Sequence, residues 1–100
     1  MIKTLTVTLT PTITVHIRYF ASAKAAVGLP EETMTAGADS TVQDVLTRLG
    51  MAYGEQLTRI LASASFLLEG IAVRDPLAAI ASTPGTKHVA LDILPPFAGG

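Results

Sequence analysis

The chain has 100 residues, of which 49% are hydrophobic and 15% are charged, and its formal net charge is −1. This composition predicts one folded domain rather than a disordered chain, and the seven scattered Lys and Arg residues argue against nucleic-acid binding. The absence of cysteine excludes disulfides and thiol chemistry, and we expect a soluble cytoplasmic protein because no bilayer-length apolar run or secretory signal is present.

The first fifth of the chain alternates apolar and polar residues, which is the pattern of half-buried β-structure. Threonine fills many polar positions, and its branched Cβ favours strands. Pro11 interrupts the pattern and cannot donate a hydrogen bond to a sheet ladder. We therefore predict a core strand over residues 12–20. Residues 1–11 are interpreted as an N-terminal extension or an extra edge strand, which would also be able to pair between chains.

A short helix and a short strand are predicted next. Residues 21–27 are rich in alanine and are followed by Gly28, a residue typical of helix ends. Residues 32–36 have the composition of a short return strand.

The main helix is predicted to begin after Thr41, which is suited to cap it together with Asp44. The following apolar residues recur at helical spacing, and Gly50 is expected to end the helix. A second helical stretch is predicted over residues 55–62. The apolar stripe of the main helix consists of Val42, Val45, Leu46 and Leu49.

The last third of the chain predicts three strands and a turn of helix. Residues 65–68 and 71–73 are short strand candidates joined by a tight turn at Glu69-Gly70. One helical turn is predicted over residues 76–80, and residues 88–94 form the last strand.

These elements predict an α+β domain, in which a mixed sheet of four or five strands packs on one main helix with short helical turns. The first and last long strands are the most apolar, so we expect them to lie adjacent in the centre of the sheet. The domain is predicted to span residues 12–94, and residues 95–100 form an extended tail.

The tail is Pro95-Pro96-Phe97-Ala98-Gly99-Gly100. Proline stiffens the backbone, and glycine removes the Cβ that would hinder entry into a narrow channel. The distinctive group at its tip is the α-carboxylate of Gly100. The tail therefore favours a chain that presents its carboxyl terminus to the active site of another protein, with an idle tail as the alternative.

The body of the chain shows no catalytic apparatus of its own. His16 and His88 have no His, Asp or Glu at metal-ligand spacing, so we predict no metal site. The neighbours Glu31 and Glu32 are expected to point to opposite sides of a strand, which makes them a poor acid–base pair.

Four residues are candidates for contact with a partner. Lys24 is expected to be exposed and is either a docking cation or a solubilising residue. Phe20 and Leu94, taken singly, are more typical of core residues. Phe97 is harder to bury within one domain and is a plausible interface anchor.

Four segments occur in the order and approximate spacing of a known family, the ubiquitin-like sulfur carriers. They are Ile17-Arg18-Tyr19-Phe20-Ala21, Ser40-Thr41-Val42-Gln43-Asp44-Val45-Leu46, Phe66-Leu67-Leu68-Glu69-Gly70 and Leu94-Pro95-Pro96-Phe97-Ala98-Gly99-Gly100. Across residues 12–100 the chain resembles this family of the MoaD/ThiS type, and its closing segment is most similar to the small subunit of molybdopterin synthase.

The resemblance implies a β-grasp (ubiquitin-like) fold and a sulfur-carrier function. The carboxylate of Gly100 would be adenylated by an E1-like adenylyltransferase, which uses ATP, and converted to a thiocarboxylate with sulfur from a sulfurtransferase. The carrier would bind no cofactor itself. Its tail would enter the large subunit of molybdopterin synthase, in a heterotetramer, and donate sulfur to cyclic pyranopterin monophosphate in molybdenum cofactor biosynthesis.

The same resemblance assigns roles to further residues. Gly99, with Ala98, Pro96 and Pro95, would thread the tail into the partner. Phe20 and Leu94 match apolar positions that the family uses against the partner, and Lys24 falls where the family often has a basic residue. Phe97 is assigned to the same interface from its own position after the two prolines.

The chain departs from the family pattern in its residues 1–11 and in Glu69-Gly70, which replaces a common Asn-Gly turn. Three alternatives stay open. They are a sulfur carrier for thiamine thiazole or cysteine synthesis, a ubiquitin-like modifier joined to target lysines, and a β-grasp interaction module.

Overall fold

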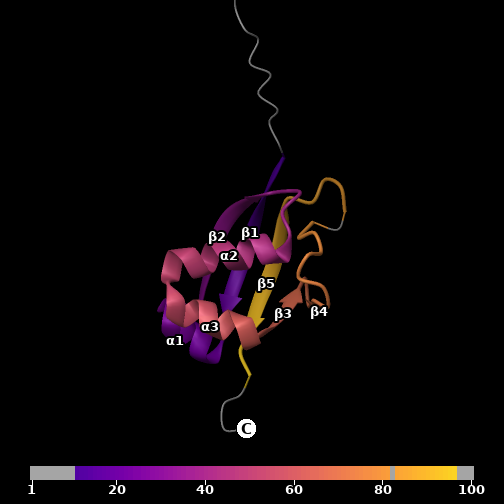
Figure 1. Cartoon of the computed structure of the whole chain (residues 1–100). Coiled ribbons are helices and arrows are strands. Elements are labelled where there is room, and N and C mark those ends of the chain that lie inside the picture. Colours follow the sequence, from indigo (N-terminus) through magenta and orange to yellow (C-terminus); the bar gives the residue numbers. More distant parts are fainter. Residues whose placement is uncertain (1–10, 82, 97–100) are drawn as a thin grey trace, which may run out of the picture.

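The computed structural model describes residues 11–81 and 83–96. Within these residues, five strands form one mixed sheet in the order β2-β1-β5-β3-β4, and three helices cover one face of it (Figure 1). The elements in chain order are β1 (Thr12–Tyr19), α1 (Ala21–Val27), β2 (Glu31–Gly37), α2 (Val42–Tyr53), α3 (Glu55–Ser63), β3 (Ser65–Leu68), β4 (Ile71–Ala72) and β5 (His88–Leu94). The predicted α+β architecture is confirmed. No helix of the described residues is long and apolar enough to cross a membrane.

The two long strands β1 and β5 run parallel in the centre of the sheet, as predicted. In this pair Val15 lies opposite Val89 and Ile17 opposite Leu91, and all four side chains are buried. β2 adds antiparallel to β1, and β3 adds antiparallel to β5. Because parallel neighbours end at the same edge, β1 and β5 deliver their carboxyl ends to one end of the sheet.

The core lies between the sheet and the helices. Each fully buried aliphatic side chain contributes about 1.5–3 kcal/mol relative to an exposed one. The predicted stripe of α2 is buried against the alternate residues of the central strands, and α3 adds two leucines. The central core residues are Ile13, Val15, Ile17 and Tyr19 of β1, Val42, Val45, Leu46 and Leu49 of α2, Leu57 and Leu61 of α3, and Val89, Leu91 and Ile93 of β5.

The predicted helix signals at Gly28 and Thr41 are confirmed. Gly28 has φ 86° and donates its N–H to the Lys24 carbonyl at 2.8 Å, which closes α1. At the start of α2, the Asp44 N–H donates to Thr41 Oγ1 at 3.0 Å, and the Thr41 N–H donates to Asp44 Oδ2 at 2.9 Å. This reciprocal capping box fixes where α2 begins.

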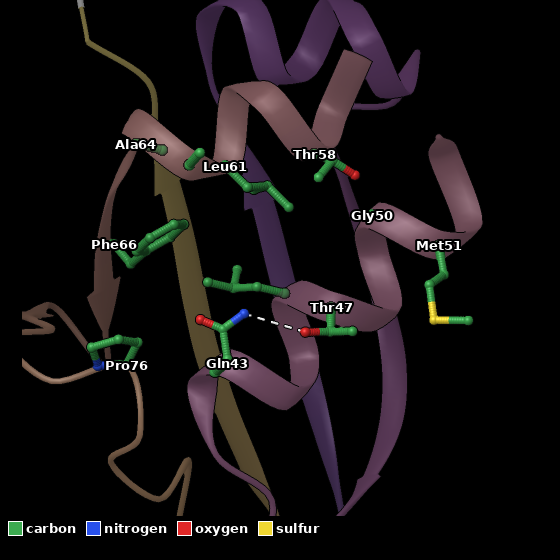
Figure 2. Close-up of a pocket in the computed structure, with 11 residues that line it drawn as sticks. Gln43, Thr47, Gly50, Met51, Thr58, Leu61, Ala64, Phe66 and Pro76 are labelled. Atoms are coloured by element: carbon green, nitrogen blue, oxygen red, sulfur yellow. Dashed lines mark hydrogen bonds between the residues drawn. The ribbon is translucent and has the colours of Figure 1, made fainter. Parts of the chain in front are cut away.

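The prediction that Gly50 ends the main helix is wrong. α2 continues through Gly50 to Tyr53, and Gly50 is buried where α2 crosses α3. A Cβ at this position would lie 2.6 Å from Thr58 Oγ1, and Figure 2 shows the two residues facing each other. Glycine is therefore present for a close helix approach and not as a helix stop. The second helical stretch is a full helix, α3.

The turn between β3 and β4 is formed as predicted. Glu69 and Gly70 both have positive φ, 52° and 78°, which is the signature of a type I′ turn. The helical turn predicted over residues 76–80 is wrong. There the Ala78 N–H donates to the Asp75 carbonyl in a turn, and Ala79 forms an isolated bridge with Thr41. Pairing with the chain that precedes α2 takes the backbone groups that a helical turn would need.

Candidate functional site

The face of the sheet opposite the helices, called the open face below, is formed by side chains that alternate with the core residues. It continues to the end of the sheet where β5 finishes and the tail begins. Its residues include Thr14, His16 and Arg18 of β1, Glu31, Thr33 and Thr35 of β2, Leu67 of β3, and His88, Ala90, Asp92 and Leu94 of β5.

Phe20 lies beside the end of β5. Its N–H donates to the Ile93 carbonyl at 3.3 Å, and its side chain is 41% exposed. The interpretation of Phe20 as a core residue is therefore wrong. The apolar alternation of β1 ends at Tyr19, and Phe20 takes the capping position before α1, outside the core.

Leu94, Pro95 and Pro96 carry the chain out of the sheet. Leu94 is half-buried on the open face opposite Ser65, Pro95 is buried, and Pro96 is exposed. A buried first proline fixes the direction in which the tail departs, because its φ is set by the ring. The remaining predicted tail residues, Phe97, Ala98, Gly99 and Gly100, lie outside the described residues, and their roles stay predictions.

Lys24 is exposed, as expected. It lies one turn of α1 after Phe20, and its N–H approaches the Phe20 carbonyl at 3.4 Å. The structure thus brings Phe20, Lys24 and Leu94 to the end of the sheet from which Pro95 and Pro96 lead the tail.

An ion pair on the open face was missed by sequence reasoning. Arg18 Nε donates to Asp92 Oδ1 and Arg18 Nη2 donates to Asp92 Oδ2, each at 2.6 Å. Asp92 is 5% exposed and is the one buried polar or charged residue within 11–81 and 83–96. The hydrogen bonds to Asp92, and then the negative charge of Asp92, raise the pKa of the Arg18 guanidinium above its usual value.

A second polar contact lies beside this pair on the open face. His16 Nε2 and Glu31 Oε1 are 2.6 Å apart, and both side chains are exposed. Glu32 points to the helix side, so the prediction that Glu31 and Glu32 diverge is confirmed. Across the described part of the chain, no group of three His, Cys, Asp or Glu residues is placed to hold a metal ion.

Glu32 ties two tyrosines together on the helix side. Its Oε2 accepts from the hydroxyls of Tyr19 at 2.5 Å and Tyr53 at 2.6 Å, and the two rings meet edge to face. The hydrogen bond to Glu32, and then burial, raise the pKa of Tyr53 to about 12. Burial, and then the same carboxylate, raise the pKa of Tyr19 well above its usual value. This cluster anchors the end of α2 to β2 and β1.

A groove of about 570 Å³ lies on the helix side, between α2, α3 and β3 (Figure 2). Leu46, Leu61 and Phe66 form much of its apolar lining, and its internal polar contact joins Gln43 Nε2 to Thr47 Oγ1 at 3.2 Å. None of its described lining residues is titratable or nucleophilic at neutral pH except weakly reactive hydroxyls. The groove therefore offers shape but no reactive group.

No protein-family model and no curated protein matches the chain. Several solved structures do. The HVO 2177 protein of Haloferax volcanii is 28% identical, with TM-score 0.71 over 89% of this chain and 88% of that one. The small archaeal modifier protein SAMP1 of the same organism is 23% identical, with TM-score 0.70 over 87% and 99%.

Two further similar structures are molybdopterin-converting factors. The putative subunit 1 from Pyrococcus furiosus is 16% identical, with TM-score 0.70 over 84% of this chain and 98% of that one. A complex of subunits 1 and 2 from Helicobacter pylori contains a chain that is 20% identical, with TM-score 0.53 over 88% and 100%. The chain therefore has the β-grasp fold of the MoaD/ThiS-type ubiquitin-like proteins, as predicted.

Proposed function

We propose that this chain is a ubiquitin-like sulfur carrier that works through the carboxylate of Gly100. The proposal rests on the arrangement of residues at the end of the sheet where β5 finishes. The central strand β5 ends at Leu94, the chain continues through Pro95 and Pro96 towards its terminal glycines, and an exposed aromatic residue, Phe20, lies beside the end of β5. A rigid body with an apolar contact and a stiff lead-in is suited to presenting its terminus.

The proposed chemistry needs no catalytic group on this chain. A carboxylate oxygen of Gly100 attacks the α-phosphorus of ATP in an activating enzyme, and pyrophosphate leaves. The persulfide of a sulfurtransferase then attacks the acyl carbon, and AMP leaves. A thiol reductant attacks the resulting acyl disulfide at the sulfurtransferase sulfur, the S–S bond breaks, and the thiocarboxylate remains on Gly100. Sulfur held on a tail reaches a closed site without release into water.

Within this function, we assign the chain to molybdopterin synthesis as the small subunit of the synthase. The Pro95-Pro96-Phe97 lead-in favours this pathway over the carriers for thiamine thiazole and cysteine. The subunit complex from H. pylori supports a large-subunit partner for a protein of this fold. Phe20 and Leu94, with Phe97, are proposed to contact that subunit, and Lys24 to assist docking.

Mass spectrometry tests the carrier function directly. The purified chain is incubated with the E1-like adenylyltransferase and the sulfurtransferase of its own organism, ATP, a sulfur source and a thiol reductant. We expect the C-terminal peptide to gain the mass difference between sulfur and oxygen. A variant lacking Gly99 and Gly100 should gain nothing; an equal gain in that variant, or none in the full chain, contradicts the proposal.

Docking is tested with two matched variants. Phe20→Ala removes an exposed aromatic beside the tail, whereas Met51→Ala removes an 81% exposed side chain on the helix side. We expect the first to weaken co-purification with the large synthase subunit and the second to leave it unchanged. Phe20, Lys24 and Leu94 together are called the docking end below, and equal effects of both variants would contradict its assignment.

The ubiquitin-like modifier is the second candidate, because SAMP1 has the same fold. Its signature is an isopeptide bond between Gly100 and lysines of other proteins. Trypsin cleaves after Lys87, the last basic residue of the chain, so a target lysine would carry residues 88–100 as its remnant. A search of trypsin-digested cell extract for lysines with this remnant separates the two functions. Abundant remnants that depend on Gly100, without thiocarboxylate, would favour the modifier.

A further inference from the structure

Asp92 lies in an unusual place for a charged residue. It interrupts the most buried strand of the sheet, between Arg18 on β1 and Leu67 on β3, and is 5% exposed. Withdrawing a carboxylate from water is costly, and an apolar pair of similar volume is often as stable as a buried ion pair. The fold alone does not require this pair, and Arg18 extends it to the surface of the open face.

Arg18 has one edge engaged and one edge available. Its Nε and Nη2 atoms donate to the two oxygens of Asp92. Within the described residues, no acceptor takes the N–H groups of Nη1, and 48% of the Arg18 side-chain surface is exposed. The second edge of a guanidinium is a fork that matches the two oxygens of a carboxylate. Asp92 thus holds Arg18 flat and fixed, with that fork unoccupied.

The pair lies within the proposed docking end. Leu94 follows Asp92 by two residues on the same face, and Phe20 follows Arg18 by two residues. Arginine is enriched among the residues that dominate binding energy at interfaces, and apolar neighbours such as Phe20 and Leu94 exclude water from such a contact.

We propose that Arg18 is the polar determinant of partner docking on the open face, and that it takes a carboxylate of the E1-like activating enzyme. Asp92 is then a positioning residue that holds the guanidinium in place. This inference rests on the proposed carrier function, in which the activating enzyme must dock before Gly100 reacts.

The charges around the docking end favour an acidic partner. Although the whole chain carries a net charge of −1, the carboxylate of Asp92 is buried and that of Glu31 already contacts His16. Arg18 and Lys24 are the exposed cations of this end, and Glu31, which lies opposite Arg18 on β2, is the exposed carboxylate beside them. A partner that covers this end therefore meets cationic groups, and complementary charge there raises both specificity and the rate of association.

The test measures ATP–pyrophosphate exchange by the purified activating enzyme against carrier concentration. The double variant Arg18→Met/Asp92→Leu removes the pair without leaving a buried charge unpaired. We expect its KM to rise about tenfold or more with kcat unchanged, since truncating an interfacial charge contact has this scale of effect. Arg18→Lys keeps the charge but loses the fork, so its KM should also rise, by less.

Two controls separate docking from stability. The matched variant Arg59→Met/Glu55→Leu removes the exposed pair of α3, whose atoms are 2.8 Å apart on the helix side, and should leave KM unchanged. The thermal midpoint of the open-face double variant should equal or exceed that of the wild type.

Salt supplies the readout that a purely structural role would not move. We expect the wild-type kcat/KM to fall as salt is added, and the open-face double variant to show a weaker dependence. An unchanged KM in that variant overturns the inference while the carrier function stands. A raised KM with the same salt dependence as the wild type overturns the proposal that Arg18 binds a carboxylate of the activating enzyme. No exchange with the wild-type chain refutes the carrier function itself, and the inference with it.

Discussion

Replacing Gly50 by alanine tests how α2 and α3 pack. In an open helix the change would stabilise the protein by about 1 kcal/mol, because alanine is the better helix former. Here the new Cβ would lie 2.6 Å from Thr58 Oγ1, a contact that forces the helices or the threonine to move. Overpacking of this kind costs about 1–3 kcal/mol, so we expect Gly50→Ala to lower the free energy of unfolding by about 1 kcal/mol.

A second substitution should reverse the sign of the effect that Gly50→Ala has on the free energy of unfolding. Thr58→Ala removes Oγ1, and the nearest remaining atoms of residue 58 are Cβ at 3.6 Å and Cα at 3.9 Å, which are ordinary contacts. In that background Gly50→Ala should stabilise the protein by about 1 kcal/mol, as the helix propensity alone predicts. The double-mutant cycle therefore predicts a coupling of about 2 kcal/mol between the two positions.

Urea unfolding followed by far-UV circular dichroism measures all four proteins, with unchanged m-values as the sign of an unchanged unfolding reaction. Thr58→Ser is the matched control, because it keeps the hydroxyl and should keep Gly50→Ala destabilising. A stabilised Gly50→Ala single variant, or additive effects of the two changes, would refute the close approach of the two helices.

Three further outcomes are expected. Alkaline titration followed by tyrosine absorbance should give a midpoint for Tyr53 near its raised pKa of about 12, and Glu32→Gln should lower that midpoint. Because the pKa of Tyr53 is higher in the folded than in the unfolded protein, the free energy of unfolding should fall as pH rises from about 10 through the folded pKa. Thr41→Ala should lower the free energy of unfolding by about 1 kcal/mol, since it removes Oγ1, which accepts from the Asp44 N–H, while the backbone N–H that donates to Asp44 Oδ2 remains. Gly28→Ala should cost about 1 kcal/mol and Gly28→Asn less, because asparagine tolerates the left-handed conformation at φ 86° better; equal unfolding midpoints for the two variants would contradict this reasoning.

Much of the fold was predictable because its local signals agree with its packing. The alternation in β1, the stripe of α2 and the Thr41 cap each point to the element that forms. The prediction that Gly50 ends the main helix was wrong for a physical reason. Glycine both ends helices and permits close helix contacts, and only the position of Thr58 on another helix decides between them.

The candidate site also contains some features that the sequence predicts and others that only the three-dimensional structure identifies. Pro95 and Pro96 are read from the sequence, because their chemistry is local. The exposure of Phe20 depends on where β1 stops, which alternation places only to within a residue. The pairing of Arg18 with Asp92 joins residues 74 positions apart and follows only from the parallel register of β1 and β5. Its one local signal was a carboxylate inside the apolar run of β5.

The two faces of the sheet have different roles, since one stabilises the fold and the other is proposed to bind the partner. Docking can therefore be tested by substitutions on the open face. Stability is concentrated on the helix side, where β1, β5 and α2 bury their apolar residues together. Open-face changes should therefore alter docking with little effect on folding, with Asp92 as the exception because it is buried there. Removing Arg18 alone would leave that carboxylate without its partner and confuse lost stability with lost docking. Only a variant that replaces both members of the pair measures what the open face contributes to recognition.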